Sequence, residues 1–160
     1  AETSDQLTMQ TSENKIKFNL GSMKLISKVI DGKFPDYEKV IPKDERVSAK
    51  SNIEEFISAL DRLKSLSSDR KGVIKISLNN GIMKFLINDS IAGDGIEEVQ
   101  TQYKGEAMEI GFNSNYLIDV ANVLESKDIT LMLKDATSPT CIKDESDPLS
   151  TYIIMPMRVI

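Results

Sequence analysis

The sequence has 160 residues, of which 40% are hydrophobic and 28% are charged, a composition typical of globular proteins. It contains no histidine, which excludes a Ser-His-Asp triad and histidine-ligated metals, and its single cysteine excludes an internal disulfide. The net charge of −5 means that bulk attraction cannot drive binding to nucleic acid or to an anionic membrane.

No apolar run approaches the ~20 residues that span a bilayer. The single cysteine is typical of a reducing compartment, so we expect a cytoplasmic protein without a membrane partner.

Residues 7–30 predict a short antiparallel meander, because apolar and polar residues alternate around Leu7 and Met9 and again from Ile16 to Leu20. So short a meander cannot bury an apolar face by itself. We therefore expect residues 1–31 to be the last strands of an incomplete domain. The Gly- and Pro-containing segment that follows marks the boundary, and residues 32–160 form the second domain.

Residues 45–103 predict one strand, one helix and three further strands. A strand at about 45–50 leads to Ser51 and Glu54, whose spacing is typical of a helix capping box with Ser51 as the N-cap. Apolar residues then recur at helical spacing, at Ile53, Phe56, Ile57, Leu60 and Leu63. Strands follow at about 73–78, 82–88 and 97–103, the first two joined by a tight turn at Asn80-Gly81.

Residues 107–159 predict the same order of elements again. A strand at 107–112 precedes a helix cap at Asn113, and the second helical stripe consists of Leu117, Val120, Ala121 and Leu124. Strands follow at about 129–134, 138–143 and 151–159. This duplication predicts an α+β fold in which two helices pack on one side of antiparallel sheets.

The polar faces of the two helices then point outward together. They carry Glu55, Ser58, Arg62 and Ser65 on the first helix and Asn115, Asp119, Asn122 and Ser126 on the second. Such a surface is wet and nearly neutral.

Three features could indicate catalysis, and each has a simpler interpretation. Gly93-Asp94-Gly95 is interpreted as a hairpin turn, the Asp144–Asp147 stretch as a solvated acidic turn, and Cys141 as a buried structural thiol. We therefore predict no catalytic residue, no cofactor and no metal site.

The C-terminal run Tyr152–Ile160 is apolar and contains Pro156 between two methionines. Proline cannot donate to a strand ladder, so Pro156 predicts an edge or a break in pairing. Two interpretations stay open. The run is either a final core strand, or one wall of an apolar groove for a peptide, where flexible methionines accept varied partners and Arg158 guides them.

Four ordered motifs resemble one family, the bacterial sliding clamp, which is the beta subunit of DNA polymerase III. They are Phe34-Pro35-Asp36-Tyr37 with Val40-Ile41-Pro42, then Lys71-Gly72-Val73, then Met108–Asn113, and finally Met155-Pro156-Met157-Arg158. The resemblance covers the whole chain, as the last strands of a middle domain followed by the C-terminal domain.

The resemblance implies the clamp fold and a non-catalytic accessory subunit of a DNA-directed DNA polymerase, a transferase complex with an associated 3'-5' exonuclease. It implies a head-to-tail dimeric ring that holds double-stranded DNA by topology, without sequence preference. The helices would line the hole, with Ser58, Arg62, Asn115 and Asn122 facing DNA. Ser65 and Leu66 would lie at the subunit interface, although Leu66 could equally cover the loop that follows its helix.

The resemblance further implies a cleft for short peptide motifs of the polymerase alpha subunit, the clamp loader and repair proteins. Its residues here would be Pro35, Lys39, Val40, Tyr116, Thr137, Pro139, Ile153, Met155, Pro156, Met157 and Arg158. Lys39 stands where the family commonly has arginine, and it lacks the planar fork of arginine. Pro139 stands where a small polar residue is common. The middle-domain wall of the cleft would lie mostly before Ala1.

Two other functions remain as alternatives. One is a protein-interaction domain unrelated to DNA. The other is a magnesium-dependent enzyme, which would need converging carboxylates, whereas the acidic residues are scattered along the sequence.

Overall fold

The computed structural model describes residues 6–32, 36–44, 46–66, 72–89 and 93–158. The chain divides into two compact units, residues 1–36 and 37–160. Within the described residues, neither helix is long and apolar enough to cross a membrane.

The first unit is a three-stranded antiparallel sheet in the order β1-β2-β3, as the alternation predicted. Its strands are β1 (Leu7–Thr11), β2 (Lys15–Leu20) and β3 (Met23–Lys28). None of its described residues is buried, and Leu7, Met9 and Met23 each expose more than half of their surface. This sheet has no core of its own.

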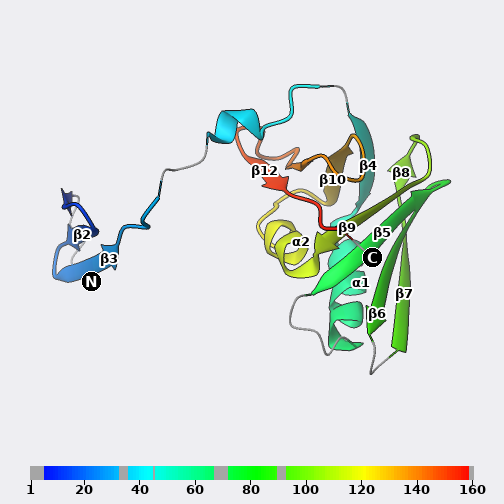
Figure 1. The fold of residues 1–160 in the computed structure, drawn as a ribbon, viewed down its shortest axis with the longest axis horizontal. Coiled ribbons are helices and arrows are strands. Elements are labelled where there is room, and N and C mark those ends of the chain that lie inside the picture. Colours follow the sequence, from blue (N-terminus) through cyan, green and yellow to red (C-terminus); the bar gives the residue numbers. More distant parts are fainter. Residues whose placement is uncertain (1–5, 33–35, 45, 67–71, 90–92, 159–160) are drawn as a thin grey trace. The chain divides into compact units, whose positions relative to one another are not determined.

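The second unit contains the duplicated order of elements. The first half has β4 (Val47–Asn52), α1 (Ile53–Leu66), β5 (Val73–Asn79), β6 (Ile82–Asp89), β7 (Gly93–Gln100) and the short β8 (Gln102–Tyr103). The second half has β9 (Met108–Asn113), α2 (Ser114–Ala121), β10 (Asp128–Leu133), β11 (Thr140–Lys143) and β12 (Thr151–Ile154). A 3-10 turn, η1 (Tyr37–Lys39), precedes both halves. The predicted order of the repeat is confirmed (Figure 1), except that the strand predicted at about 97–103 is divided into β7 and β8, which lie in different sheets.

Each half donates its first strand to the sheet of the other half. The five-stranded sheet has the order β12-β11-β10-β4-β8, and the four-stranded sheet has the order β7-β6-β5-β9. Thus β4 pairs with β10, and β9 pairs with β5, both antiparallel. Because of this exchange, neither half completes its sheet alone.

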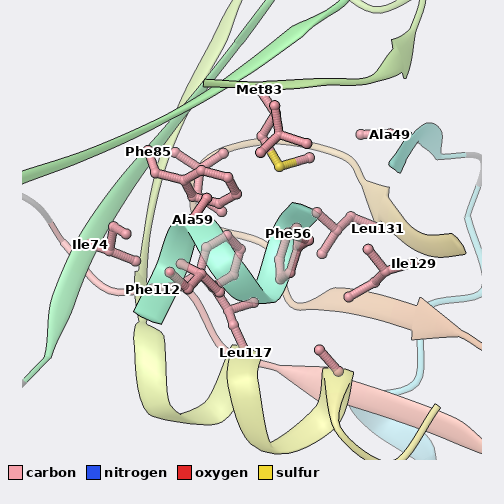
Figure 2. Packing of buried hydrophobic residues seen from close by; sticks show 14 of the residues in the cluster. Ala49, Phe56, Ala59, Ile74, Met83, Phe85, Phe112, Leu117, Ile129 and Leu131 are labelled. Carbon is pink, nitrogen blue, oxygen red and sulfur yellow. The ribbon is translucent and has the colours of Figure 1, made fainter. Parts of the chain in front are cut away.

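The two helices contact each other and cover the sheets from one side. Helix α1 packs on β4, β6, β7 and β10, while α2 packs on β9 and β12. Phe56 of α1 meets Phe85 of β6 edge to face, with 5.3 Å between ring centroids. Figure 2 shows Phe56 between Phe85 of the four-stranded sheet and Leu131 of the five-stranded sheet. Phe112 and Leu117 of the second half lie beside it. One continuous core therefore joins both halves.

The N-cap of α1 is Asn52, so the prediction of Ser51 was wrong. The Asn52 Oδ1 atom accepts hydrogen bonds from the backbone N–H groups of Glu54 and Glu55, at 3.0 and 3.1 Å. Ser51 is still in β4, and its side chain points into the protein, where it is buried. The Asn113 cap of α2 is confirmed, since its side chain accepts from the Asn115 backbone N–H at 2.9 Å.

The Gly93–Gly95 stretch is not a turn, contrary to prediction, because it begins strand β7. Helix α1 packs closely on this strand: a Cβ atom at Gly95 would come within 2.7 Å of the Leu63 side chain, which would have to shift. The Asn80-Gly81 turn is confirmed, and both residues have the positive φ angles, 46° and 79°, that a tight hairpin requires.

The interpretation of 144–147 as a solvated turn is wrong at Asp144, whose side chain is buried, while Glu145 and Ser146 are exposed. The Asp144 carboxylate accepts hydrogen bonds from the Ser146 hydroxyl, from the Ser146 backbone N–H and from the Glu125 backbone N–H. These bonds hold the pKa of Asp144 well below its usual range, the Ser146 hydroxyl contributing most. The carboxylate thereby joins the β11–β12 connection to the segment after α2.

Truncating Phe56 tests whether one shared core holds both halves. Phe56→Ala is expected to lower the free energy of unfolding by about 3–5 kcal/mol, because a fully buried ring leaves a cavity. Urea denaturation followed by circular dichroism measures this. Val123→Ala, which removes an exposed side chain, should change stability by less than about 0.5 kcal/mol. Equal, small effects of the two substitutions would contradict the shared core.

Candidate peptide-binding site

The C-terminal segment passes from one sheet to the other. Strand β12 pairs with β11, which places Ile153 opposite Cys141, and it ends at Ile154. The predicted strand to residue 159 is therefore too long, because Pro156 has no N–H to continue the ladder. After this break the Met157 backbone N–H donates to the Gly111 carbonyl of β9 at 2.8 Å.

The same break occurs in the first half. Strand β7 ends at Gln100, and β8 then pairs with β4 in the opposite sheet. The position of Met157 beside β9 is therefore the second copy of an arrangement that the fold uses twice.

Most of this segment stays on the surface, as a peptide-binding wall requires. Ile154 is buried, but Met155 and Met157 expose 57% and 36% of their surface. Ile153 and Pro156 are half-buried, and Arg158 is exposed. A backbone held on both sides thus presents apolar side chains to solvent.

The connection between β10 and β11 runs beside this segment. Thr140 pairs with Ile154, so Pro139 directly precedes this last pair and Met155 directly follows it. Asp135 closes the connection, because its carboxylate accepts hydrogen bonds from both the backbone N–H and the hydroxyl of Thr137 and of Ser138, at 2.7–2.8 Å. These bonds, with the Ser138 hydroxyl contributing most, hold the pKa of Asp135 far below its usual range.

The remaining cleft candidates come from two other elements. Lys39 ends η1 and is exposed, and Val40, 40% exposed, donates its backbone N–H to the Tyr37 carbonyl at 3.1 Å. Tyr116 lies in the first turn of α2 and is 58% exposed. Since α2 follows β9 directly, Tyr116 stands near the strand that binds Met157. Pro35 lies outside the described residues.

The predicted DNA-facing residues lie on the two helices or at their ends. Ser58, Arg62 and Asn122 are exposed, and Asn115 is half-buried. The Arg62 guanidinium binds both carboxylate oxygens of Glu97 on β7, with Nε–Oε1 and Nη2–Oε2 distances of 2.9 and 2.7 Å. Sequence reasoning missed this pair, because the partners are 35 positions apart and only the packing of α1 on β7 brings them together.

Ser65 and Leu66, the interface candidates, end α1. The Ser65 hydroxyl donates to the Arg62 carbonyl, and Leu66 is exposed while its side chain also reaches Gly95 of β7.

Cys141 is buried as expected, and burial raises the pKa of its thiol. Among the described residues, no group of three or more acidic or cysteine side chains is arranged to hold a metal ion.

The family described as DNA polymerase III beta subunit, C-terminal domain, matches residues 38–158. The beta sliding clamp of Caulobacter vibrioides (strain NA1000 / CB15N) is 36% identical over 155 residues, which are 97% of this chain and 42% of that protein. The chain therefore spans less than half the length of this relative.

Solved structures give the same result. The Caulobacter crescentus pol III beta structure has a TM-score of 0.85 at 36% identity, covering 98% of this chain and 42% of that one. A Bartonella birtlesii sliding clamp bound to griselimycin has a TM-score of 0.83 at 38% identity, covering 96% and 41%. These relatives are named as clamps or as the beta subunit, and none of the three names describes a catalytic subunit.

The Asp135 turn predicts an acid-sensitive wall. A carboxyl whose pKa is lowered by folding stabilises the native state above its unfolded pKa of about 3.9, and this contribution is lost as pH falls below that value. Asp135→Asn should therefore lower the melting temperature at pH 6, and the difference from the unsubstituted chain should shrink between pH 4 and pH 2.5. Thermal melts across this range measure it.

The exposed Asp119 provides the matched control. Asp119→Asn should leave the pH profile of melting unchanged. A gap between Asp135→Asn and the unsubstituted chain that stays constant from pH 6 to pH 2.5 would contradict the role of the ionised carboxylate.

Proposed function

This chain belongs to the DNA polymerase III beta subunit family, and we propose that it supplies the C-terminal part of a clamp that encircles duplex DNA and tethers the replicative polymerase. The family resemblance drawn from four motifs and the clamp fold are both confirmed. The observation that carries the proposal is the match over residues 38–158 together with the duplicated, strand-exchanged fold.

A ring needs two joining edges on every subunit, and the second unit has two equivalent ones. Strands β7 and β12 are each the third strand of their repeat, and each is the edge strand of its sheet. Edge strands carry unpaired backbone groups that can extend a sheet into a neighbour. We assign the β7 edge to the next subunit, because exposed Ile96 lies on β7 and exposed Leu66 adjoins Gly95. Ser65 belongs to the same end of α1.

We propose that residues 1–31 are the last strands of a middle domain. Their exposed apolar side chains support this, since a sheet with no buried residue requires a covering layer.

The helix surface suits sliding rather than tight binding. Every Lys or Arg that neutralises a phosphate releases counterions and adds salt-dependent affinity. In this chain Glu97 already neutralises Arg62, while Ser58, Asn115 and Asn122 are uncharged. Such a lining leaves the ring linked to DNA by topology, with water between helices and phosphates.

The exposed methionines and Pro156 would bind short apolar motifs of the polymerase alpha subunit, the clamp loader and repair proteins. Recognition of this kind concentrates its free energy in a few apolar anchors. The clamp needs no cofactor and catalyses no reaction in this role, and we place it in the cytoplasm with its DNA.

Topological linkage gives a direct test of the ring. The assembled ring that contains this chain, loaded by its clamp loader, should remain on a nicked circular plasmid and dissociate when a restriction enzyme linearises it. Gel filtration of loaded complexes in 0.5 M salt measures retention. Equal retention on circular and linear DNA would contradict encirclement and would indicate ordinary binding.

Met157 tests the cleft independently of the ring. Met157→Ala should weaken binding of a synthetic peptide from the clamp-binding segment of the alpha subunit by roughly tenfold, because truncating an apolar anchor typically costs more than about 1 kcal/mol. Isothermal titration calorimetry measures the Kd. Met9→Ala, which truncates another exposed methionine, on β1, is the control. An unchanged Kd for Met157→Ala would refute the cleft assignment.

A further inference from the structure

Arg46 is almost completely buried although it lies in the connection between η1 and β4. Its side chain exposes 6% of its surface. One guanidinium nitrogen, Nη1, donates to the Pro139 carbonyl, and Nε donates to Asp44 Oδ1 at 3.1 Å. A buried cation is costly unless it is paired, and here the guanidinium is paired with the Asp44 carboxylate and the Pro139 carbonyl.

Asp44 also contacts the start of the β10–β11 connection, at Lys134. Its second oxygen, Oδ2, binds the Lys134 ammonium at 2.8 Å. The Lys134 ammonium and Arg46 both lower the pKa of Asp44, with the Lys134 hydrogen bond as the largest cause. The carboxylate therefore stays ionised at neutral pH and serves two cations at once.

These three charged residues fix the β10–β11 connection at both of its ends. Lys134 follows the last residue of β10, and Pro139 precedes the first residue of β11. Asp135 closes the middle of the connection with the hydrogen bonds described above. The anchor comes from a segment that begins a few residues after Lys39 and Val40.

We propose that Arg46 is a positioning residue for peptide binding, which holds the Thr137–Pro139 wall of the cleft in its binding geometry through the Pro139 carbonyl. The inference rests on the proposed cleft and adds to it a residue that touches no peptide. Asp44 and Lys134 support Arg46. Together they tie the segment after Val40 to the Thr137–Pro139 wall, so that the two move as one body. A wall fixed before binding spares the ordering cost that a loose loop would add.

The experiment compares Arg46→Met with Arg62→Met in the full-length subunit that contains this chain. Both substitutions remove an arginine that is paired with a carboxylate, but Arg62 pairs with Glu97 on β7. The probe is the alpha-subunit peptide used for Met157. We expect Arg46→Met to raise the peptide Kd roughly five- to tenfold, the equivalent of ordering one or two side chains, and Arg62→Met to leave it unchanged.

Two further readouts separate positioning from a general loss of stability. Hydrogen exchange should quicken for amides of residues 134–139 in Arg46→Met, whereas amides of the β5–β6 hairpin should keep their protection. Arg46→Lys, which keeps the charge without the fork, should recover only part of the affinity. Should Arg46→Met fail to fold, Asp44→Asn takes its place, because Asp44 is partly exposed and its loss frees both cations.

The outcomes distinguish this inference from the proposed function. If the unsubstituted full-length subunit does not bind the peptide, the cleft itself is wrong and the inference falls with it. If the unsubstituted subunit binds and Arg46→Met binds equally well, the cleft stands and the positioning role of Arg46 is overturned. Uniformly faster exchange across the second unit would assign Arg46 to stability alone.

Discussion

The exchange of first strands between the two halves is the constraint on which the rest of the structure depends. Neither half can complete its sheet or cover its helix alone, so the apolar faces of α1, α2 and both sheets are buried together. Phe56, Phe85 and Phe112 lie in this shared core (Figure 2). As a consequence, the third strand of each half, β7 or β12, lies at an edge of its sheet, and these two edges are equivalent in the repeat.

The candidate peptide-binding site follows from the same exchange. A chain that leaves β12 must bridge to β9 to complete the second copy of the pattern that β7 and β8 make in the first half. The bridge holds the backbone at Met157 while leaving the methionine side chains exposed. Apolar side chains on a fixed backbone are suited to binding, because little backbone conformational entropy remains to be lost when a peptide binds.

Several charged side chains are committed to partners within the protein. Arg46 is committed to Asp44 and Pro139, and Arg62 to Glu97. Asp135 and Asp144 are committed to nearby N–H and hydroxyl groups, which lower the pKa of both. The proposed DNA-facing residues Ser58, Asn115 and Asn122 are uncharged, and this agrees with the proposed ring, which would hold DNA by topology.

The periodicity of the sequence by itself determined the elements and their duplication, because alternation and helical stripes are local consequences of which face is buried. The turn at Asn80-Gly81 and the cap at Asn113 were equally local. Only the tertiary structure decided that Gly95 lies in a strand, where Leu63 of helix α1 packs closely against it. It also decided that Asn52 rather than Ser51 caps α1 and that Asp144 is buried. The Arg46–Pro139 and Arg62–Glu97 contacts join residues far apart in the chain, and no pattern along a sequence encodes which distant carbonyl or carboxylate a folded arginine will meet.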